Sequence, residues 1–151
     1  MSMIDEMYVP FEAAKLLQEL DFNQKCRNYY LDDGSRFGHW CNEIIPKDMA
    51  VYECPTLQIA MEWIMKRHLI FPEFRLCLGD NSEKGRYLIG VYEQTAIDTY
   101  TWQTWLYGKD YTDACQKFLM YSLKKIKADR EAAEKEEDKQ ELSSEVPEDK
   151  T

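Results

Sequence analysis

The chain has 151 residues, 44% of them hydrophobic and 13% aromatic, which is enough apolar side chain for one packed core. Its formal net charge of −9 disfavours binding to nucleic acid or to an anionic membrane by electrostatic attraction alone. No apolar run approaches the roughly 18 residues of a membrane-spanning helix, and the first residues lack a signal-peptide pattern, so we expect a cytoplasmic protein.

The first third of the chain predicts a short helix followed by a few strands. Apolar residues recur at helical spacing in Phe11–Leu20, which predicts an amphipathic helix. The aromatic-rich run Cys26–Leu31 predicts a strand, and Asp32–Ser35 has strong turn chemistry. Phe37–Cys41 could return as the hairpin partner, and Ala50–Glu53 predicts a short strand or an extended lead into the next helix.

The stretch Pro55–His68 is the most apolar helical pattern of the chain. Its apolar face is so wide that few positions are left for water. Pro55 suits a first helical turn, Thr56 is the alternative cap, and Pro72 forbids helix soon afterwards. We therefore expect this helix at the centre of the core. Its apolar positions are Leu57, Ile59, Ala60, Met61, Trp63, Ile64 and Met65.

Three β-like runs follow, at Phe74–Leu78, Arg86–Tyr92 and Thr99–Trp105. The loop between the first two is polar and has a glycine at each end, which makes this the clearest hairpin in the sequence. The third run is rich in threonine and aromatic residues and would extend the hairpin into a meander. Thr112 is then expected to cap a helix that continues to Lys127.

The end of the chain carries most of the charge imbalance. Residues 128–151 contain ten acidic and four basic side chains, a net charge of −6, which leaves −3 for residues 1–127. Residues 128–140 are good helix formers without an apolar face, so we expect a solvated, fraying helix and, from Ser143, disorder. The prediction is an α+β fold. One domain, residues 1–127, packs three helices on a mostly antiparallel sheet (an α/β sandwich), and residues 128–151 form an acidic, helical-to-disordered tail.

Two helix-packing patterns accompany this order of elements: Ala-x-x-Trp at Ala60 and Trp63, and Tyr-x-x-Ala at Tyr111 and Ala114. In these features residues 10–126 resemble a group of small uncharacterised proteins encoded by bacteriophages and mobile elements of gut bacteria. The chain is also distantly similar to the phage ABA-sandwich domain, in which helices pack on an antiparallel sheet. The resemblance implies a small phage-type accessory protein and supplies no catalytic residues.

Residue types that bind zinc gather at His39 and Cys41, with Cys26 and Cys54 further away on either side. Zinc sites usually use close pairs of cysteines, so buried thiols and a partly exposed imidazole are the alternative explanation. Cys54 precedes a helix whose dipole would favour a thiolate, but His68 lies about 20 Å away at the other end and cannot serve as its base. No metal or other cofactor is expected, and a cysteine- or metal-dependent enzyme is the weakest of three hypotheses.

A dense band of aromatic side chains runs through the predicted meander. In a regular strand over Thr99–Trp105, Trp102 and Trp105 lie on opposite faces, so one of them is expected to be exposed, as in a protein-binding patch. A β-bulge near Gln103 would instead put both on one face, and ordinary sheet packing is the alternative explanation. The candidate partner-binding residues are Trp102, Trp105, Tyr100, Tyr92 and Tyr107.

A second group of side chains suits single-stranded nucleic acid, since tyrosines that stack on bases accompany arginines that contact phosphate. The group consists of Arg27, Arg36, Arg75 and Arg86 with Tyr29, Tyr30, Tyr87 and Tyr92. The acidic tail opposes this function by repulsion, so nucleic acid is not the expected partner. The leading hypothesis is a non-catalytic accessory or regulatory protein that binds either an unknown protein partner or a second copy of itself. Single-stranded nucleic-acid binding is the alternative.

Overall fold

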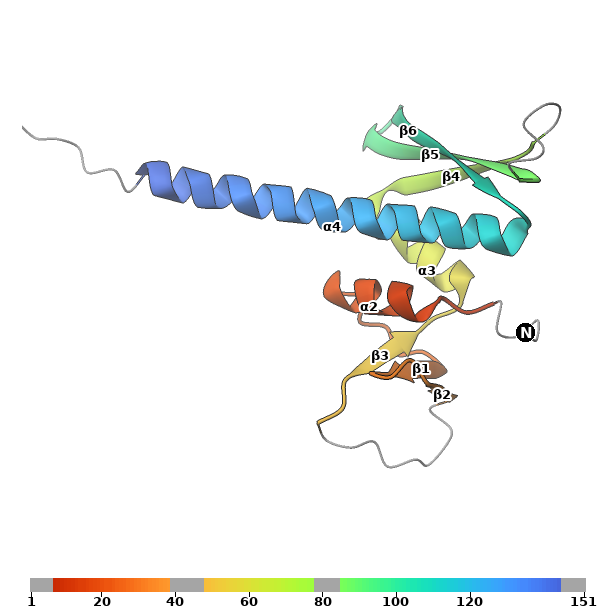
Figure 1. Cartoon of the computed structure of the whole chain (residues 1–151). Helices are drawn as coiled ribbons and strands as arrows, with labels where there is room; N and C mark the ends of the chain where they lie inside the picture. Colours follow the sequence, from red (N-terminus) through yellow and green to blue (C-terminus); the bar gives the residue numbers. More distant parts are fainter. Residues whose placement is uncertain (1–6, 39–47, 78–84, 145–151) are drawn as a thin grey trace, which may run out of the picture.

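The computed structural model describes residues 7–38, 48–77 and 85–144 (Figure 1). These residues form three α-helices and two three-stranded antiparallel sheets, which confirms the α+β prediction. The strands are divided between two sheets, and the helices lie between them (Figure 1). Each sheet therefore has one face toward the helices.

The N-terminal part contains helix α2 and the first sheet. Helix α2 spans Phe11–Glu19, and the strands are β1 (Asn28–Leu31), β2 (Arg36–Gly38) and β3 (Val51–Cys54). Their order is β2-β1-β3, and α2 packs against β3. The turn between β1 and β2 contains Gly34 with φ of +87°, a left-handed conformation that favours glycine. The predicted helix, the turn and the strands Cys26–Leu31 and Ala50–Glu53 are confirmed, with small shifts at their ends. The predicted hairpin partner Phe37–Cys41 is confirmed at Phe37 and Gly38, and its residues 39–41 lie outside the described residues.

The predicted central helix is present as two consecutive segments. Helix α3 spans Leu57–Trp63, and its cap is Thr56, whose side chain accepts a hydrogen bond from the Ile59 N–H at 3.2 Å. The helix continues as a π-helical turn, η1, over Ile64–His68. Leu69 then adopts a left-handed conformation with φ of 56°, which ends the helix.

The second sheet is the predicted meander. Its strands are β4 (Ile70–Leu76), β5 (Tyr87–Ala96) and β6 (Thr99–Gly108), in the order β4-β5-β6. Strand β4 begins before the predicted position and includes Pro72. Proline is tolerated there because β4 lies at the edge of the sheet, where an absent N–H need not break a ladder.

A β-bulge interrupts β6. Val91 of β5 pairs with Thr104, and the next residue, Tyr92, pairs with Trp102. Gln103 is therefore an extra residue outside the register of the two strands. Side chains alternate regularly between the two faces before Gln103 and again after it, but the alternation shifts by one residue at the bulge. A simple period of two along the whole of β6 therefore assigns residues to the wrong face.

Helix α4 spans Tyr111–Ser144 and passes between the second sheet and the helices α2 and α3 (Figure 1). Its cap is Asp110, whose carboxylate accepts a hydrogen bond from the Asp113 N–H at 2.8 Å. The prediction that Thr112 caps this helix is wrong, because Thr112 lies inside the first turn.

The core is built around the first half of α4. Phe118, Leu119 and Leu123 are fully buried, and they join Ile64 of η1 and Ile89 of β5 in one cluster. Beyond Ile126 the helix loses its apolar side, and residues 131–142 are exposed. This agrees with the expected solvated helix over 128–140. The prediction of disorder from Ser143 is wrong for Ser143 and Ser144, because α4 includes them, and residues 145–151 lie outside the described residues. Among the helices described, none is both long and apolar enough to cross a membrane.

A chain ending at Lys127 should unfold with nearly the stability of the full chain. The deletion removes Arg130, whose Nη1 lies 3.3 Å from the Asp21 carboxylate and 3.2 Å from the Glu19 carbonyl, both at the surface. Exposed ion pairs contribute about 0.2–1 kcal/mol, so the expected loss stays below about 1 kcal/mol in urea unfolding. Arg130→Ala in the full chain is the control and should reproduce part of that loss, because the deletion also removes Asp129, whose carboxylate lies 2.9 Å from the Lys125 ammonium. A loss above about 2 kcal/mol would show that residues 128–151 pack on the domain or on a second subunit.

Candidate functional site

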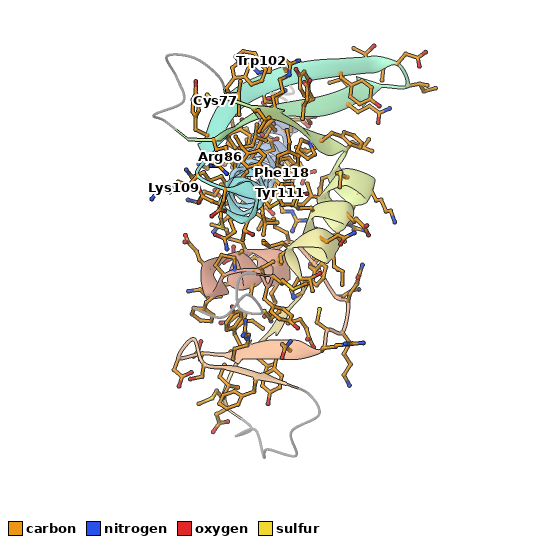
Figure 2. The ribbon with its side chains drawn as sticks, turned by 90° about the vertical axis from the view of Figure 1, so that its right-hand side faces the viewer. Cys77, Arg86, Trp102, Lys109, Tyr111 and Phe118 are labelled. Atoms are coloured by element: carbon orange, nitrogen blue, oxygen red, sulfur yellow. The ribbon has the colours of Figure 1, made fainter. Side chains whose placement is uncertain are left out.

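The second sheet has one covered and one open face. Along β5, Ile89 and Val91 are fully buried toward α4, whereas Leu88, Gly90 and Tyr92 alternate to the opposite side. No helix or strand of the described ranges covers that opposite side (Figure 1). Figure 2 shows Trp102 above the sheet and Phe118 beneath it, on α4.

The bulge places both tryptophans of β6 on the open face. Trp105 pairs with Gly90 and Trp102 pairs with Tyr92, and these two β5 residues point the same way. The two indole rings lie 6.0 Å apart, with their planes inclined by 45°. The prediction for a regular strand, that they lie on opposite faces, is wrong. The alternative of a β-bulge near Gln103 is confirmed, because this extra residue puts both tryptophans on one face.

The open face is rich in exposed aromatic side chains. Tyr100, Trp102 and Trp105 are 54%, 50% and 38% exposed. Tyr92 and Tyr107 are partly buried on the same side of the sheet, so all five candidate partner-binding residues share one face. Phe71 of β4 joins them, with its ring 5.7 Å from that of Tyr100. We refer to this surface as the aromatic face, formed by Phe71, Tyr92, Tyr100, Trp102, Trp105 and Tyr107.

A glycine lets two of these rings lie close against the sheet. A Cβ atom added to Gly90 would come within 2.8 Å of the Trp105 ring and 3.0 Å of the Tyr92 ring. The Trp105 ring from the neighbouring strand and the Tyr92 ring from the same strand cover this glycine and shield its backbone from water. The two side chains are therefore held in place before any partner arrives.

The charged groups on the aromatic face satisfy one another. The Arg75 guanidinium donates to the Glu73 carboxylate at 2.7 and 2.8 Å and lies 5.8 Å from the centre of the Trp105 ring. Hydrogen bonds from Arg75 and from the Tyr92 hydroxyl lower the pKa of Glu73, and the bond to Glu73 raises the pKa of Tyr92. One positive and one negative charge cancel here, so the face attracts neither sign.

The edges of the sheet are less available than its open face. In β6, the Lys117 ammonium donates to the Tyr107 carbonyl at 2.6 Å, and the Gln103 amide donates to the Thr101 carbonyl at 3.3 Å. In β4, Pro72 has no N–H to offer. Bulges, prolines and side chains that bind the backbone all discourage the addition of a further strand.

The candidate cysteine and metal residues do not form a site within the described residues. His39 and Cys41 lie outside those residues. Cys54 ends β3 and is fully buried, and burial raises its pKa to about 11, so the expectation of a thiolate favoured by the helix dipole is wrong. His68 packs against Trp63 at 4.8 Å between ring centres, and burial lowers its pKa. The described residues contain no group of three or more His, Cys, Asp or Glu placed to hold a metal ion.

Cys54 should react slowly with iodoacetamide in the native protein. A pKa near 11 instead of 9.0 lowers the thiolate fraction at pH 8 about 100-fold, and burial slows the reaction further. Mass spectrometry should find all five cysteines unmodified by disulfide formation, with Cys54 labelled rapidly only after unfolding in urea. Rapid labelling of native Cys54, or a stoichiometric zinc ion, would contradict this prediction and favour the His39 and Cys41 site.

The residues of the nucleic-acid hypothesis are separated. Arg36 lies in β2 of the first sheet and Arg75 lies in β4 of the second, with the helices between the two sheets (Figure 1). Tyr29 and Tyr30 are buried, so neither ring is free to stack on a base.

Sequence reasoning did not include Phe71 and Gly90 in the candidate surface. Phe71 lies before the predicted strand Phe74–Leu78. Extending the strand backwards by its alternation of faces, from Arg75 through Glu73, would have placed Phe71 on the same face. Gly90 has no side chain and therefore gives no sequence signal of this kind. Comparison of the chain with protein-family models, with curated proteins and with solved structures found no match.

Proposed function

We propose that this chain is a non-catalytic accessory or regulatory protein that binds another protein through the aromatic face. The observation that carries the proposal is the gathering of three exposed aromatic side chains, Tyr100, Trp102 and Trp105, on one open sheet face. A large aromatic side chain has about 150–250 Å² of surface, so three that are about half exposed present on the order of 300 Å². Patches of this size on a monomer are often functional, and they are large enough for the centre of a standard interface.

The chemistry of the face favours a protein over a single-stranded nucleic acid. Tryptophan, tyrosine and arginine are enriched where interfaces derive most of their binding energy. Phosphate binding would need free positive charge, but Arg75 is paired with Glu73 at 2.7 Å, and the whole chain carries a net charge of −9.

The partner proposed is a different protein and not a second copy. Two copies of a chain with a charge of −9 repel each other, and about 300 Å² of aromatic surface is small for a permanent dimer. The resemblance to proteins of phages and mobile elements supports an accessory role in the cytoplasm.

The test compares the double variant Trp102→Ala/Trp105→Ala with Ile97→Ala, whose side chain is also exposed but lies in the β5–β6 turn. A protein that co-purifies with the wild type is identified and purified, and its dissociation constant is measured for each variant. The double variant should bind at least ten-fold more weakly, a loss of about 1.4 kcal/mol, while Ile97→Ala binds as the wild type does.

Three results would overturn the proposal. One is equal affinity of the double variant and the wild type for the purified partner. Another is concentration-dependent dimerisation in sedimentation velocity that Trp102→Ala/Trp105→Ala abolishes, which would assign the face to a second copy. The last is binding of a thymidine oligonucleotide that weakens steeply with salt, which would favour the nucleic-acid hypothesis.

A further inference from the structure

A groove with mainly apolar walls lies on the helix side of the second sheet. It has a volume of about 600 Å³ and lies between α3, the inner side of β4 and the first turns of α4. This volume is within the range of about 300–1,000 Å³ that ligand sites occupy. Its β4 residues, Pro72 and Phe74, face away from the aromatic face, so the two surfaces are separate. We refer to it as the α3–α4 groove.

One wall of the groove is a stripe of long apolar side chains. Leu57, Met61 and Met65 follow one another at intervals of four residues along α3 and η1, so they line one side of the helix. Met7 stands at the mouth with 60% of its surface exposed. Three of the chain's seven methionines therefore line this one groove. Methionine is unbranched and polarisable, and surfaces rich in it adapt to the side chains of a partner.

The opposite wall is the start of α4. Tyr111 is 56% exposed, and its ring packs 5.3 Å from that of Phe74 on the floor of the groove. Cys115 follows one turn later and is buried. An exposed tyrosine packed against a partly buried phenylalanine gives a partner an apolar ring surface that is already ordered.

The charge in the groove is negative. Among the described residues that line the groove, Glu62 is the only charged one, and it forms no ion pair with another described residue. The domain itself, residues 1–127, has a net charge of −3 and the whole chain −9. An occupant is therefore best matched when it combines an apolar surface with positive charge at its border.

The backbone beside the groove disfavours a partner that binds as an added strand. The nearest sheet edge is β4, where Pro72 lines the groove and supplies no N–H. A helix needs no such donor, because its backbone hydrogen bonds are made internally, and it presents apolar residues at i, i+3, i+4 and i+7.

We propose that the α3–α4 groove is a second binding site, which takes an amphipathic helix with an apolar face and a basic polar face. The apolar face lies against Met61, Met65 and Tyr111, and a lysine or arginine at its border meets Glu62. The site shares no residue with the aromatic face, so it does not depend on the function proposed for that face.

The experiment uses three fluorescent 18-residue peptides and the full chain. The first peptide has leucine at i, i+3, i+4 and i+7 positions and lysine elsewhere, the second has glutamate in place of lysine, and the third is a shuffled version of the first. Fluorescence anisotropy should show that the first binds at least ten-fold more tightly than either of the others. Equal binding of the first and third peptides would overturn the proposal, because charge attraction alone would then explain it.

Substitutions locate the site. Met7→Ser and Tyr111→Ser should each weaken binding of the first peptide several-fold, while Leu76→Ser and Ile97→Ser, at exposed apolar residues outside the groove, should not. Glu62→Lys should reverse the preference between the lysine and glutamate peptides, whereas Glu12→Lys, an equal change of charge on α2, should leave it unchanged. Circular dichroism checks that each variant is folded. Equal effects of groove and control substitutions, or loss of peptide binding in Trp102→Ala/Trp105→Ala, would reject the groove as the site.

Discussion

Replacing Phe118 by alanine is expected to lower the free energy of unfolding by about 3–5 kcal/mol. Phe118 is fully buried on α4, in the part of the helix that contacts the second sheet on one side and α2 and α3 on the other. The substitution removes a whole aromatic ring and leaves a cavity that neighbours from several elements cannot fill together. Since domains of this size are usually stable by about 5–15 kcal/mol, this one change would remove a large part of the total.

Urea unfolding followed by circular dichroism measures this loss. The slope of the unfolding free energy against urea concentration should be unchanged, which would show that the variant buries the same surface on folding. Lys124→Ala is the matched control, because Lys124 is exposed on the same helix, and it should change stability by less than about 0.5 kcal/mol. A loss below about 1 kcal/mol for Phe118→Ala would mean that the sheet and the helices do not share one core.

Replacing Ile64 by alanine should cost about 2–5 kcal/mol. Ile64 is fully buried and begins η1, where the α-helical turns of α3 give way to a π-helical turn. Its side chain belongs to the same cluster as Phe118, so its loss opens a cavity on the α3 side of that cluster. The near-continuous apolar surface of this helix in the sequence leads to the same expectation.

Ile59→Ala is the control for this prediction, because Ile59 is the same residue type on α3 but is 41% exposed. Ile59→Ala should cost less than about 1 kcal/mol, because an exposed isoleucine buries little apolar surface that the substitution could remove. Thermal unfolding of the two variants side by side is the measurement. Equal losses would remove the α3–η1 segment from the core.

The helices and the meander were predictable from the sequence because their signals are local. The apolar spacing of α2, the glycine-flanked loop before β5 and the threonine- and aromatic-rich β6 each lie within about a dozen residues. The helix composition of residues 128–140 is local in the same sense, and the helix does continue there. The candidate aromatic residues were also found in this way, since their density along the chain is visible without knowledge of their faces.

The register of the strands was not predictable, since it depends on a partner strand. Which residue of β6 faces Tyr92 is decided by pairing with β5, and the bulge at Gln103 has no sequence signature of its own. The division of the strands into two sheets has the same cause, because strand pairing beyond a hairpin is decided by the packing of the whole chain. The α3–α4 groove was missed for a related reason: its walls come from Met7, Met61, Phe74 and Tyr111, which are distant in sequence.

Two local sequence signals gave wrong predictions, one for the capping residue of α4 and one for the ionisation of the Cys54 thiol. Thr112 and Asp110 are both good capping residues, and the choice of Asp110 depends on where β6 ends. At Cys54, the helix dipole favours the thiolate, but complete burial disfavours it more strongly and the pKa rises to about 11. Burial is a property of the tertiary structure, so a sequence pattern at a helix end cannot establish it.

Because Gln103 is an extra residue in β6, this strand can lose one residue at that position without a change in the register of its neighbours. A one-residue deletion in a strand normally turns every side chain beyond it to the other face. Loss of Gln103 would instead convert the bulge into regular pairing and leave Trp102 and Trp105 on the open face, with Thr104 still opposite Val91. Loss of Leu106 in the regular part of β6 would bring Tyr107 opposite Ile89 and turn its side chain toward α4. A one-residue deletion in this strand therefore preserves the aromatic face at the bulge and disrupts it beside the bulge.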